Sequence, residues 1–321
     1  MRERTGPAPS LYALAAATVV ASGLVAYWVS RPAGSLPAPA PSGTVGFAAP
    51  SGPEAWTKVA LPASVALHAI EGGADVAWVV GDGGTIVRRH RAEDVWAPER
   101  SGTTANLRAV AVSGDRVLAC GDGGAVVELS GPGATFAGRP SGTTVTLRAI
   151  RSTTFGVIAA GDDGTIVRSS PDGTLAPVKS PTTKTLRGIC ASLGEAWIVG
   201  DSGTLIRVSL FGLEPVASGT TERLNAVTCD ATTVIAVGEH GTVVTRREAN
   251  GPFVASREGD VEWLTIASFY GTTTWVAGGR GAALSASYES KRRGLEGHVE
   301  GIANTSLGTF AVGPKGLFAM K

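Results

Sequence analysis

Short apolar runs recur along most of the chain, and each is interrupted by the same polar turn. The stretch WVVGDGGTIVRR, at Trp78–Arg89, is a clear copy. An Asp-Gly pair between two apolar, β-branched runs suits the tight turn of a hairpin, so each copy predicts two antiparallel strands. The first glycine of the turn recurs seven times, and a second glycine always follows three positions later. The first glycines are Gly81, Gly121, Gly161, Gly200, Gly238, Gly278 and Gly313.

Two apolar positions outside the turn keep the same register in every copy. An aliphatic residue stands fourteen positions before each first glycine, and a large apolar residue stands eleven positions before that. The aliphatic residues are Leu67, Leu107, Leu147, Leu186, Leu224, Leu264 and Val299. The large apolar residues are Trp56, Trp96, Phe136, Leu175, Leu213, Phe253 and Tyr288. Each unit of about 40 residues therefore has four short strands, which is typical of a β-propeller blade.

The two ends of the repeat region complement each other. The first element, around Trp56, is a fourth strand with no first three strands before it, and the last unit reaches Lys321 after three strands. The pattern therefore predicts an all-β, seven-bladed β-propeller over residues 55–321, in which the N-terminal strand completes the C-terminal blade. A parallel β-solenoid is the alternative, but its repeats are shorter and would not leave this complementary remainder.

An uncharged apolar run from Leu11 to Val29 precedes the repeats, with arginines on both sides of it. A helix of this length, at about 1.5 Å per residue, reaches roughly across a hydrocarbon core of about 30 Å. The run predicts one transmembrane signal anchor over residues 11–30. The arginines near the N-terminus place residues 1–10 in the cytoplasm and everything after the helix outside it.

Residues 31–54 are rich in proline, alanine, glycine and serine, a composition typical of an extended spacer. We therefore expect a propeller tethered to the outer side of a bacterial inner membrane. A cleaved signal peptide is the alternative to a retained anchor, and it would export the propeller as well.

Composition narrows the function. The formal net charge of +1 argues against nucleic acid as a partner. Three cysteines, Cys120, Cys190 and Cys229, are too few for a disulfide framework or a zinc site, and we interpret all three as small buried residues. A Cys190–Cys229 disulfide in an oxidising compartment is the alternative.

One residue per blade is predicted to surround the mouth of the central channel, because it follows the aliphatic residue that opens the innermost strand. In chain order these residues are His68, Arg108, Arg148, Arg187, Asn225, Thr265 and Glu300. The planar guanidinium of arginine donates two parallel hydrogen bonds to a carboxylate. We therefore predict that His68 and the three arginines bind an acidic segment or the C-terminal carboxylate of a protein partner. The alternative is that the arginines only pair with the turn acids, Asp82, Asp122, Asp162, Asp201 and Glu239.

Other candidate chemistry is weaker. His68 and His298 fall near the same face, but two histidines without a third ligand make a poor metal site, so we predict no metal and no cofactor. Trp78, Trp197 and Trp275 share one strand position, which favours packing between blades over sugar binding. The turn acids recur once per blade and are therefore interpreted as turn residues, not as a catalytic pair.

The repeats resemble those of the photosystem II assembly and stability factor propellers, within the wider group of bacterial neuraminidase-type repeats. The matching motif is W-x-V-G-D-x-G-T followed by isoleucine or leucine, at Trp78–Ile86 and again at Trp197–Leu205. The resemblance covers about residues 55–321 and implies a non-catalytic chaperone or scaffold for membrane complexes, acting through an arginine-bearing face. Nothing in the sequence points to photosynthesis. The last two units depart from the pattern: Gly279 and Pro314 replace the turn acid, and Thr265 and Glu300 replace the arginine.

These observations predict a membrane-anchored, extracytoplasmic, non-catalytic scaffold for protein interaction or assembly. The alternative is a propeller that binds cell-surface glycan or a small ligand. A neuraminidase-like glycosidase is less favoured, because its chemistry needs a tyrosine nucleophile. The propeller contains only Tyr270 and Tyr288, and the second occupies a packing position.

Overall fold

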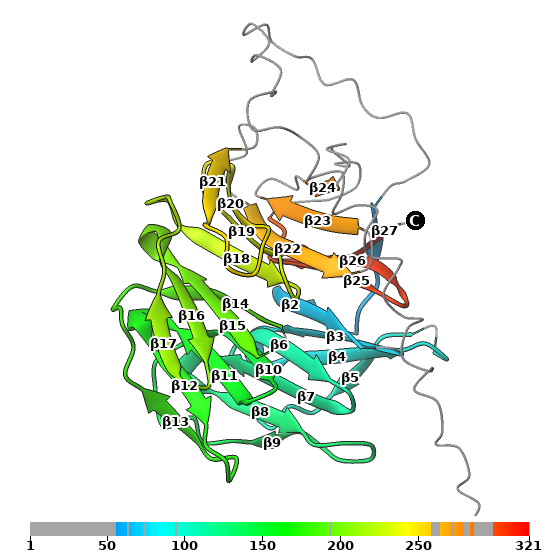
Figure 1. The fold of residues 1–321 in the computed structure, drawn as a ribbon. Coiled ribbons are helices and arrows are strands. Elements are labelled where there is room, and N and C mark those ends of the chain that lie inside the picture. The colour runs from blue at the N-terminus through cyan, green and yellow to red at the C-terminus, as the bar shows by residue number, and fades with distance from the viewer. Residues whose placement is uncertain are drawn as a thin grey trace, which may run out of the picture. The chain divides into compact units, whose positions relative to one another are not determined.

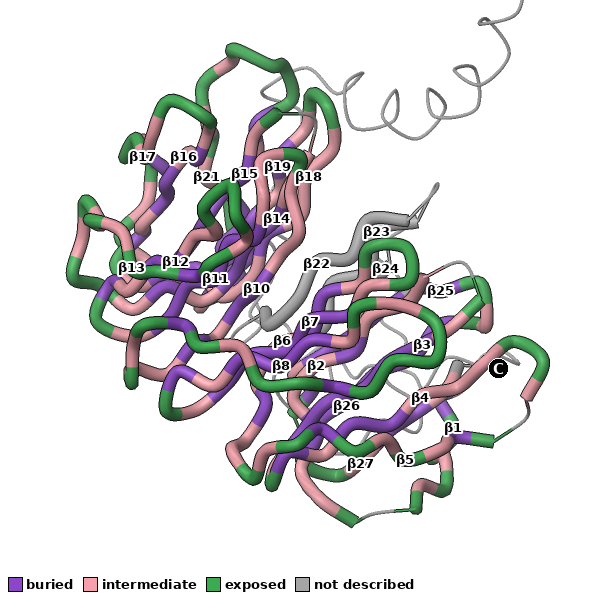
Figure 2. Tube along the Cα trace, turned by 90° about the horizontal axis from the view of Figure 1, so that it is seen from below, coloured by how far each residue is buried: buried purple, intermediate pink, exposed green. Residues whose placement is uncertain are grey.

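The computed structural model describes residues 56–257 except 63, 74, 94 and 193, the backbone of strands β22 to β24, and residues 298–320. These residues form an all-β propeller of antiparallel sheets (Figure 1). Six of the sheets have four strands each. Buried positions concentrate in the strands, and exposed positions in the connections between them (Figure 2).

Five blades run in chain order from the innermost strand to the outermost. The first blade comprises β2 (Leu67–Gly72), β3 (Val76–Gly81), β4 (Ile86–His90) and β5 (Ala97–Glu99). The second comprises β6 (Leu107–Ser113), β7 (Arg116–Gly121), β8 (Val126–Leu129) and β9 (Ala137–Gly138). The third comprises β10 (Leu147–Thr153), β11 (Gly156–Gly161), β12 (Ile166–Ser169) and β13 (Leu175–Val178). The fourth comprises β14 (Leu186–Ser192), β15 (Glu195–Gly200), β16 (Leu205–Ser209) and β17 (Gly212–Pro215). The fifth comprises β18 (Leu224–Cys229), β19 (Val234–Gly238), β20 (Thr242–Arg246) and β21 (Val254–Arg257).

The sixth four-stranded blade, called the closing blade here, combines the two ends of the repeat region. It contains β25 (Gly301–Thr305), β26 (Gly308–Gly313), β27 (Gly316–Met320) and β1 (Trp56–Val59). Strand β1 pairs antiparallel with β27, with Trp56 opposite Met320 and Val59 opposite Leu317. The prediction that an N-terminal strand completes the C-terminal blade is confirmed. The pairing satisfies the edge of β27, which would otherwise offer free backbone groups to another chain.

The prediction of a seven-bladed propeller is wrong, because the described residues form six four-stranded blades. The remaining sheet has three strands, β22 (Leu264–Tyr270), β23 (Thr273–Gly278) and β24 (Ala283–Ser285). Tyr288, which the repeat assigns to a fourth strand, lies outside the described residues. The repeat pattern counts positions in the sequence, whereas a blade requires a fourth strand that is hydrogen-bonded to the third.

The predicted transmembrane helix is not found among the described residues. The helices that the structure describes are three-residue 3-10 turns, and none is long and apolar enough to cross a membrane. The predicted span, residues 11–30, lies outside the described residues, as do the predicted cytoplasmic segment 1–10 and the predicted linker 31–54.

The 3-10 turns are the polar turns of the repeat, η1 (Asp82–Gly84), η2 (Asp122–Gly124), η3 (Asp162–Gly164) and η4 (Asp201–Gly203). Gly84 shows why the second glycine recurs. It has a φ of +73°, and a Cβ built on it would lie 2.0 Å from the carbonyl oxygen of Thr103. The connection between two blades passes so close to the turn that a side chain cannot be accommodated.

Aromatic pairs hold neighbouring blades together. The ring of Trp78 in the first blade meets Phe136 of the second edge-on, with the ring centroids 5.7 Å apart. Trp197 in the fourth blade meets Phe253 of the fifth at 5.1 Å. The prediction that these tryptophans pack between blades is therefore confirmed for Trp78 and Trp197, while the side chain of Trp275 lies outside the described residues.

Candidate functional site at the channel mouth

The innermost strands surround a central cavity. In order around it, each of β2, β6, β10, β14, β18, β22 and β25 contacts the next, and β25 contacts β2. The cavity has a volume of about 370 Å³. Its lining includes all four predicted binding residues, His68, Arg108, Arg148 and Arg187, together with Asn225 and Glu300. The structure therefore brings these residues together as the repeat predicts. The side chain of Thr265, on β22, is not among those described.

Each of the three arginines pairs with the turn acid of its own blade. Arg108 donates from Nε and Nη2 to the two carboxylate oxygens of Asp122, both at 2.9 Å. Arg148 donates in the same way to Asp162, at 2.5 and 2.9 Å. These hydrogen bonds lower the pKa of Asp122 and of Asp162 below their ordinary value, against the opposing effect of burial. The structure therefore contains the pairing between arginines and turn acids that the alternative interpretation requires.

Arg187 continues the series, and its partner Asp201 connects the fourth blade to the fifth. Arg187 Nε donates to Asp201 Oδ1 at 2.5 Å, and Arg187 Nη2 donates to Oδ2 at 3.3 Å. Asp201 also lies 3.2 Å from Arg223, which in turn contacts Glu239 at 2.9 Å. The turn acids therefore belong to ion pairs both within blades and between them.

His68 occupies the arginine position in the first blade, and both of its ring nitrogens face carboxylates. Nε2 lies 2.6 Å from Asp82 Oδ1, and Nδ1 lies 2.5 Å from Glu300 Oε2 in the closing blade. Arg108 Nη1 approaches Nε2 at 3.3 Å. Burial acts to lower the pKa of His68, but the hydrogen bonds from Glu300 and Asp82 outweigh it, so the pKa is raised.

The three arginines and His68 do not give the channel mouth an excess of positive charge. Among the described residues, its ion pairs contain four guanidinium groups, the imidazole of His68 and six carboxylates, so the carboxylates outnumber the cations even when that ring is protonated. The guanidinium groups are those of Arg108, Arg148, Arg187 and Arg223, and the anions are Asp82, Asp122, Asp162, Asp201, Glu239 and Glu300. A ligand bound here would therefore be recognised by the directions of individual donors and not by an excess of positive charge.

Donors remain on the arginines after this pairing. Arg148 and Arg187 each donate to their aspartates from Nε and Nη2. Among the described residues, the Nη1 of neither arginine donates a hydrogen bond. Both side chains line the cavity, and they are 35% and 25% exposed. The arginines can therefore contact a carboxylate entering the cavity without giving up their aspartates.

The sequence analysis did not predict the ion pair between Arg151 and Glu71, which lie farther along the inner strands than the residues at the mouth. Arg151 on β10 donates from Nη1 to Glu71 on β2 and to the carbonyl oxygen of Val110 on β6, so it links the third blade to the second and the first. Arg151 and Glu71 also line the cavity. Burial raises the pKa of Glu71, although the adjacent guanidinium opposes this. Charged residues on otherwise apolar inner strands are the signal that could have indicated the pair.

Cys190 and Cys229 form a disulfide between β14 and β18, the inner strands of two neighbouring blades. The interpretation of all three cysteines as small buried residues is therefore wrong for these two, while Cys120 is free and buried as predicted. The two cysteines are 39 residues apart, close to one repeat. Cys190 stands four residues after Leu186 and Cys229 five after Leu224, so the bond joins nearly equivalent positions of adjacent inner strands, and the disulfide alternative is the one present.

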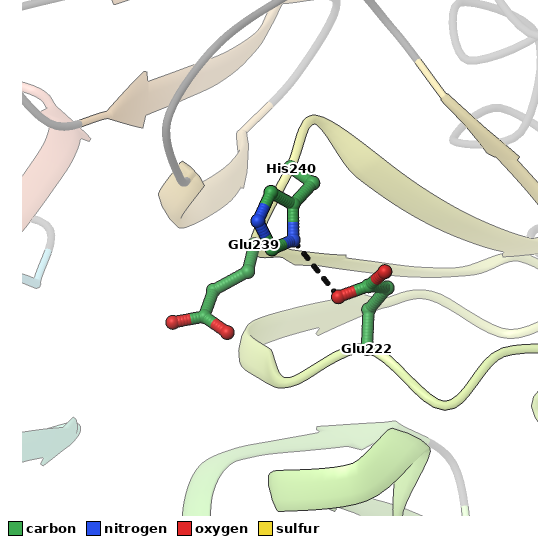
Figure 3. A group of neighbouring side chains, drawn as sticks. All are labelled: Glu222, Glu239 and His240. Atoms are coloured by element: carbon green, nitrogen blue, oxygen red, sulfur yellow. Dashed lines mark hydrogen bonds and ion pairs between the residues drawn. The ribbon is translucent and has the colours of Figure 1, made fainter.

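A second charged cluster lies on the fifth blade, where Glu222, Glu239 and His240 have potential metal-ligand atoms within 4.8 Å of one another. The imidazole faces the carboxylate of Glu222 at 2.9 Å, while the carboxylate of Glu239 points away from the ring (Figure 3). Arg257 pairs with Glu222 at 3.0 Å, and Arg223 pairs with Glu239 at 2.9 Å. Two guanidinium groups thus already compensate the two carboxylates, so the cluster is an ion-pair network.

The described tryptophans do not expose a ring on which a sugar could stack. The four described tryptophans, Trp56, Trp78, Trp96 and Trp197, are all at least 93% buried. Stacking of a sugar ring requires an exposed aromatic face. The described tryptophans therefore give no support to glycan binding.

No protein-family model matches the sequence, and no curated protein matches it. Solved structures do share the fold. "YCF48 bound to D1 peptide" is 16% identical with a TM-score of 0.62, over 83% of this chain and 94% of that chain. YCF48 from Cyanidioschyzon merolae is 14% identical with a TM-score of 0.65, over 83% and 98%. The WD40 β-propeller domain of Doa1 is 10% identical with a TM-score of 0.67, over 83% and 96%. At these identities the similarity shows a β-propeller, and it does not show the specific family.

Proposed function

We propose that the chain is a non-catalytic scaffold that holds a protein partner at the channel mouth. The supporting observation is the cavity of about 370 Å³ lined by Arg108, Arg148, Arg187 and His68. The partner would insert an acidic segment or its C-terminal carboxylate, which accepts hydrogen bonds from the Nη1 atoms of Arg148 and Arg187. A propeller of similar fold, YCF48, has been solved with a bound peptide, which is compatible with this role.

We further propose that the propeller works outside the cytoplasm. The Cys190–Cys229 disulfide supports this location, because structural disulfides persist in oxidising compartments and are rare where glutathione and thioredoxin keep thiols reduced. The oxidation state of these cysteines in protein trapped with an alkylating agent directly from cells would test the location. Free thiols in freshly alkylated protein would contradict it.

Peptide binding tests the scaffold role. The probes are a fluorescein-labelled acidic peptide with a free C-terminal carboxylate, the same peptide as a C-terminal amide, and a basic peptide of equal length. Fluorescence anisotropy with the full chain should show binding of the first probe, and weaker or no binding of the other two. Changing both Arg148→Ala and Arg187→Ala should weaken that binding at least about tenfold, since two charged hydrogen bonds are lost.

The matched control is the pair Arg88→Ala and Arg116→Ala. These arginines also pair with acids, Glu99 and Glu128, but they do not line the cavity. The control should bind the acidic peptide as the native chain does. Equal losses in both double variants, or no binding of the acidic peptide by the native chain, would rule out the channel mouth as a carboxylate site.

A further inference from the structure

The contact between the first blade and the closing blade differs from the other described contacts at the channel mouth. At the position of His68, the next three blades have Arg108, Arg148 and Arg187. His68 faces the turn acid fourteen residues ahead, Asp82, as Arg108 faces Asp122. At the contact between the first blade and the closing blade, a histidine, which titrates near neutral pH, thus takes the place of a permanently charged arginine.

The closing blade also departs from the repeat, and its departure supplies the partner of His68. Glu300 stands where three other blades have arginine, and it reaches across to Nδ1 of His68 at 2.5 Å. Strand β25, which follows Glu300, contacts β2, which contains His68. The carboxylate of Glu300 therefore joins two blades through the imidazole ring.

The hydrogen-bond geometry requires a protonated ring. Ionised carboxylates only accept hydrogen bonds, and a neutral imidazole has a single N–H to donate. Asp82 and Glu300 lie within 2.6 Å of Nε2 and Nδ1, so only the imidazolium can donate to both. With the ring neutral, one carboxylate would face a nitrogen lone pair, and the contact would become repulsive.

We propose that His68 is a pH-sensitive latch, which holds the closing blade against the first blade most firmly while it is protonated and weakens that hold when it is neutral, because the ring then donates to only one of its two carboxylates. The closing blade is built from two chain ends that meet through the β1–β27 pairing, so loss of the His68–Glu300 contact weakens the hold on strands β25 to β27. The side chain of His68 is only 9% exposed, which limits screening by solvent.

The charged groups around His68 determine which protonation state of its imidazole is favoured. Asp82 and Glu300 stabilise the imidazolium, and Arg108, whose Nη1 lies 3.3 Å from Nε2, opposes it. His298, exposed and two residues before Glu300, is the histidine nearest to Glu300 along the chain. Because the pKa of His68 is raised in the folded protein, the stabilisation is complete below the ordinary imidazole value of about 6.5. It is lost as the pH rises through the folded value.

Thermal unfolding of the full chain across pH tests the latch. The unfolding midpoint of the native protein should fall as the pH rises above about 6.5, because the ring then loses its proton at its raised pKa. The His68→Arg variant restores the cation of the other blades, and its midpoint should change less over the same range. His240→Asn removes a histidine–carboxylate contact that lies elsewhere, on the fifth blade, and should keep the native slope. Equal slopes for the native chain and His68→Arg would overturn the proposal.

A measurement on the native chain guards against a variant that does not fold. The imidazole protons of the four histidines can be titrated by NMR, with His240→Asn as one step of their assignment. His68 should titrate above about 6.5, and the Glu300→Gln variant should move its titration to lower pH. A His68 ring that titrates at or below the ordinary value would overturn the latch.

Discussion

Arg108 and Asp122 face each other through two hydrogen bonds of 2.9 Å, although fourteen residues separate them in the chain. Arg108 is the second residue of the inner strand β6, and Asp122 begins the turn η2 that follows β7. The antiparallel pairing of β6 with β7 brings Leu107 opposite Gly121, which places the two charged side chains next to each other. The same relationship recurs in Arg148–Asp162 and Arg187–Asp201.

Changing Asp122→Asn should lower the free energy of unfolding by about 1 kcal/mol at pH 7, the upper range for a partly exposed ion pair. Arg108 lowers the pKa of Asp122, so the pair contributes fully above the unfolded aspartate value of about 3.9. Its contribution is lost as the pH falls through the folded value. Urea unfolding at pH 7 and at about pH 3 should therefore show the difference from the native chain shrinking in acid.

The exposed Asp115, in the turn between β6 and β7, offers the control for this pair. Asp115→Asn should stay within about 0.5 kcal/mol of the native chain. A cost at Asp122 that persists unchanged in acid would mean that packing, and not charge, holds this turn.

Changing both Cys190→Ser and Cys229→Ser should lower the free energy of unfolding by about 2–4 kcal/mol, because the disulfide restricts the unfolded chain. The expected result is a lower urea midpoint under oxidising conditions. A reducing agent should lower the midpoint of the native protein but not change that of the double variant. A native midpoint that is insensitive to full reduction would contradict a stabilising role for the bond.

Gly84→Ala should be strongly destabilising, whereas Gly83→Ala in the same turn should cost less. Both glycines have positive φ, which costs an alanine about 1–2 kcal/mol. At Gly84 a Cβ would also lie 2.0 Å from the carbonyl oxygen of Thr103, while at Gly83 it would meet nothing within 4 Å. Thermal unfolding of both variants should therefore separate the close approach from the dihedral effect. Equal losses would show that the dihedral alone accounts for the conserved spacing of the turn.

Trp56→Ala should lower the free energy of unfolding by about 3–5 kcal/mol, the usual cost of removing a buried aromatic side chain. Trp56 is 4% exposed and packs with Val299 and Phe318, so it anchors β1 in the closing blade. Thr57→Ala, at the exposed neighbouring position of the same strand, is the control and should cost little. Equal stability of the two variants would mean that β1 does not hold the closing blade.

Most of the fold could be predicted because the repeat records local requirements. The apolar alternation and the Gly-x-x-Gly turn predicted the strands, and the orphan strand at Trp56 predicted the closure that β1 and β27 make. The number of four-stranded blades could not be predicted in the same way. A large apolar residue such as Tyr288 marks a position in the repeat, but it does not establish a hydrogen-bonded fourth strand.

The sequence predicted which residues line the candidate site, but it did not predict the balance of their charges. The repeat correctly placed His68, Arg108, Arg148 and Arg187 around one cavity. The balance between cations and carboxylates depends on side-chain directions, which the sequence pattern does not contain. The partner of His68 is Glu300, 232 residues away, so the contact exists only once the propeller is closed.

The sequence by itself determined the propeller repeat, the closure by an N-terminal strand and the residues at the channel mouth, because these follow from periodic apolar positions and turn chemistry within about 40 residues. Only the tertiary structure decided which charges meet. It paired each arginine with its turn acid, joined Cys190 to Cys229 and set His68 between two carboxylates. The physical reason is distance. Hydrogen bonds, ion pairs and disulfides form over a few ångströms, and adjacent inner strands bring together residues that are one or several repeats apart in the chain.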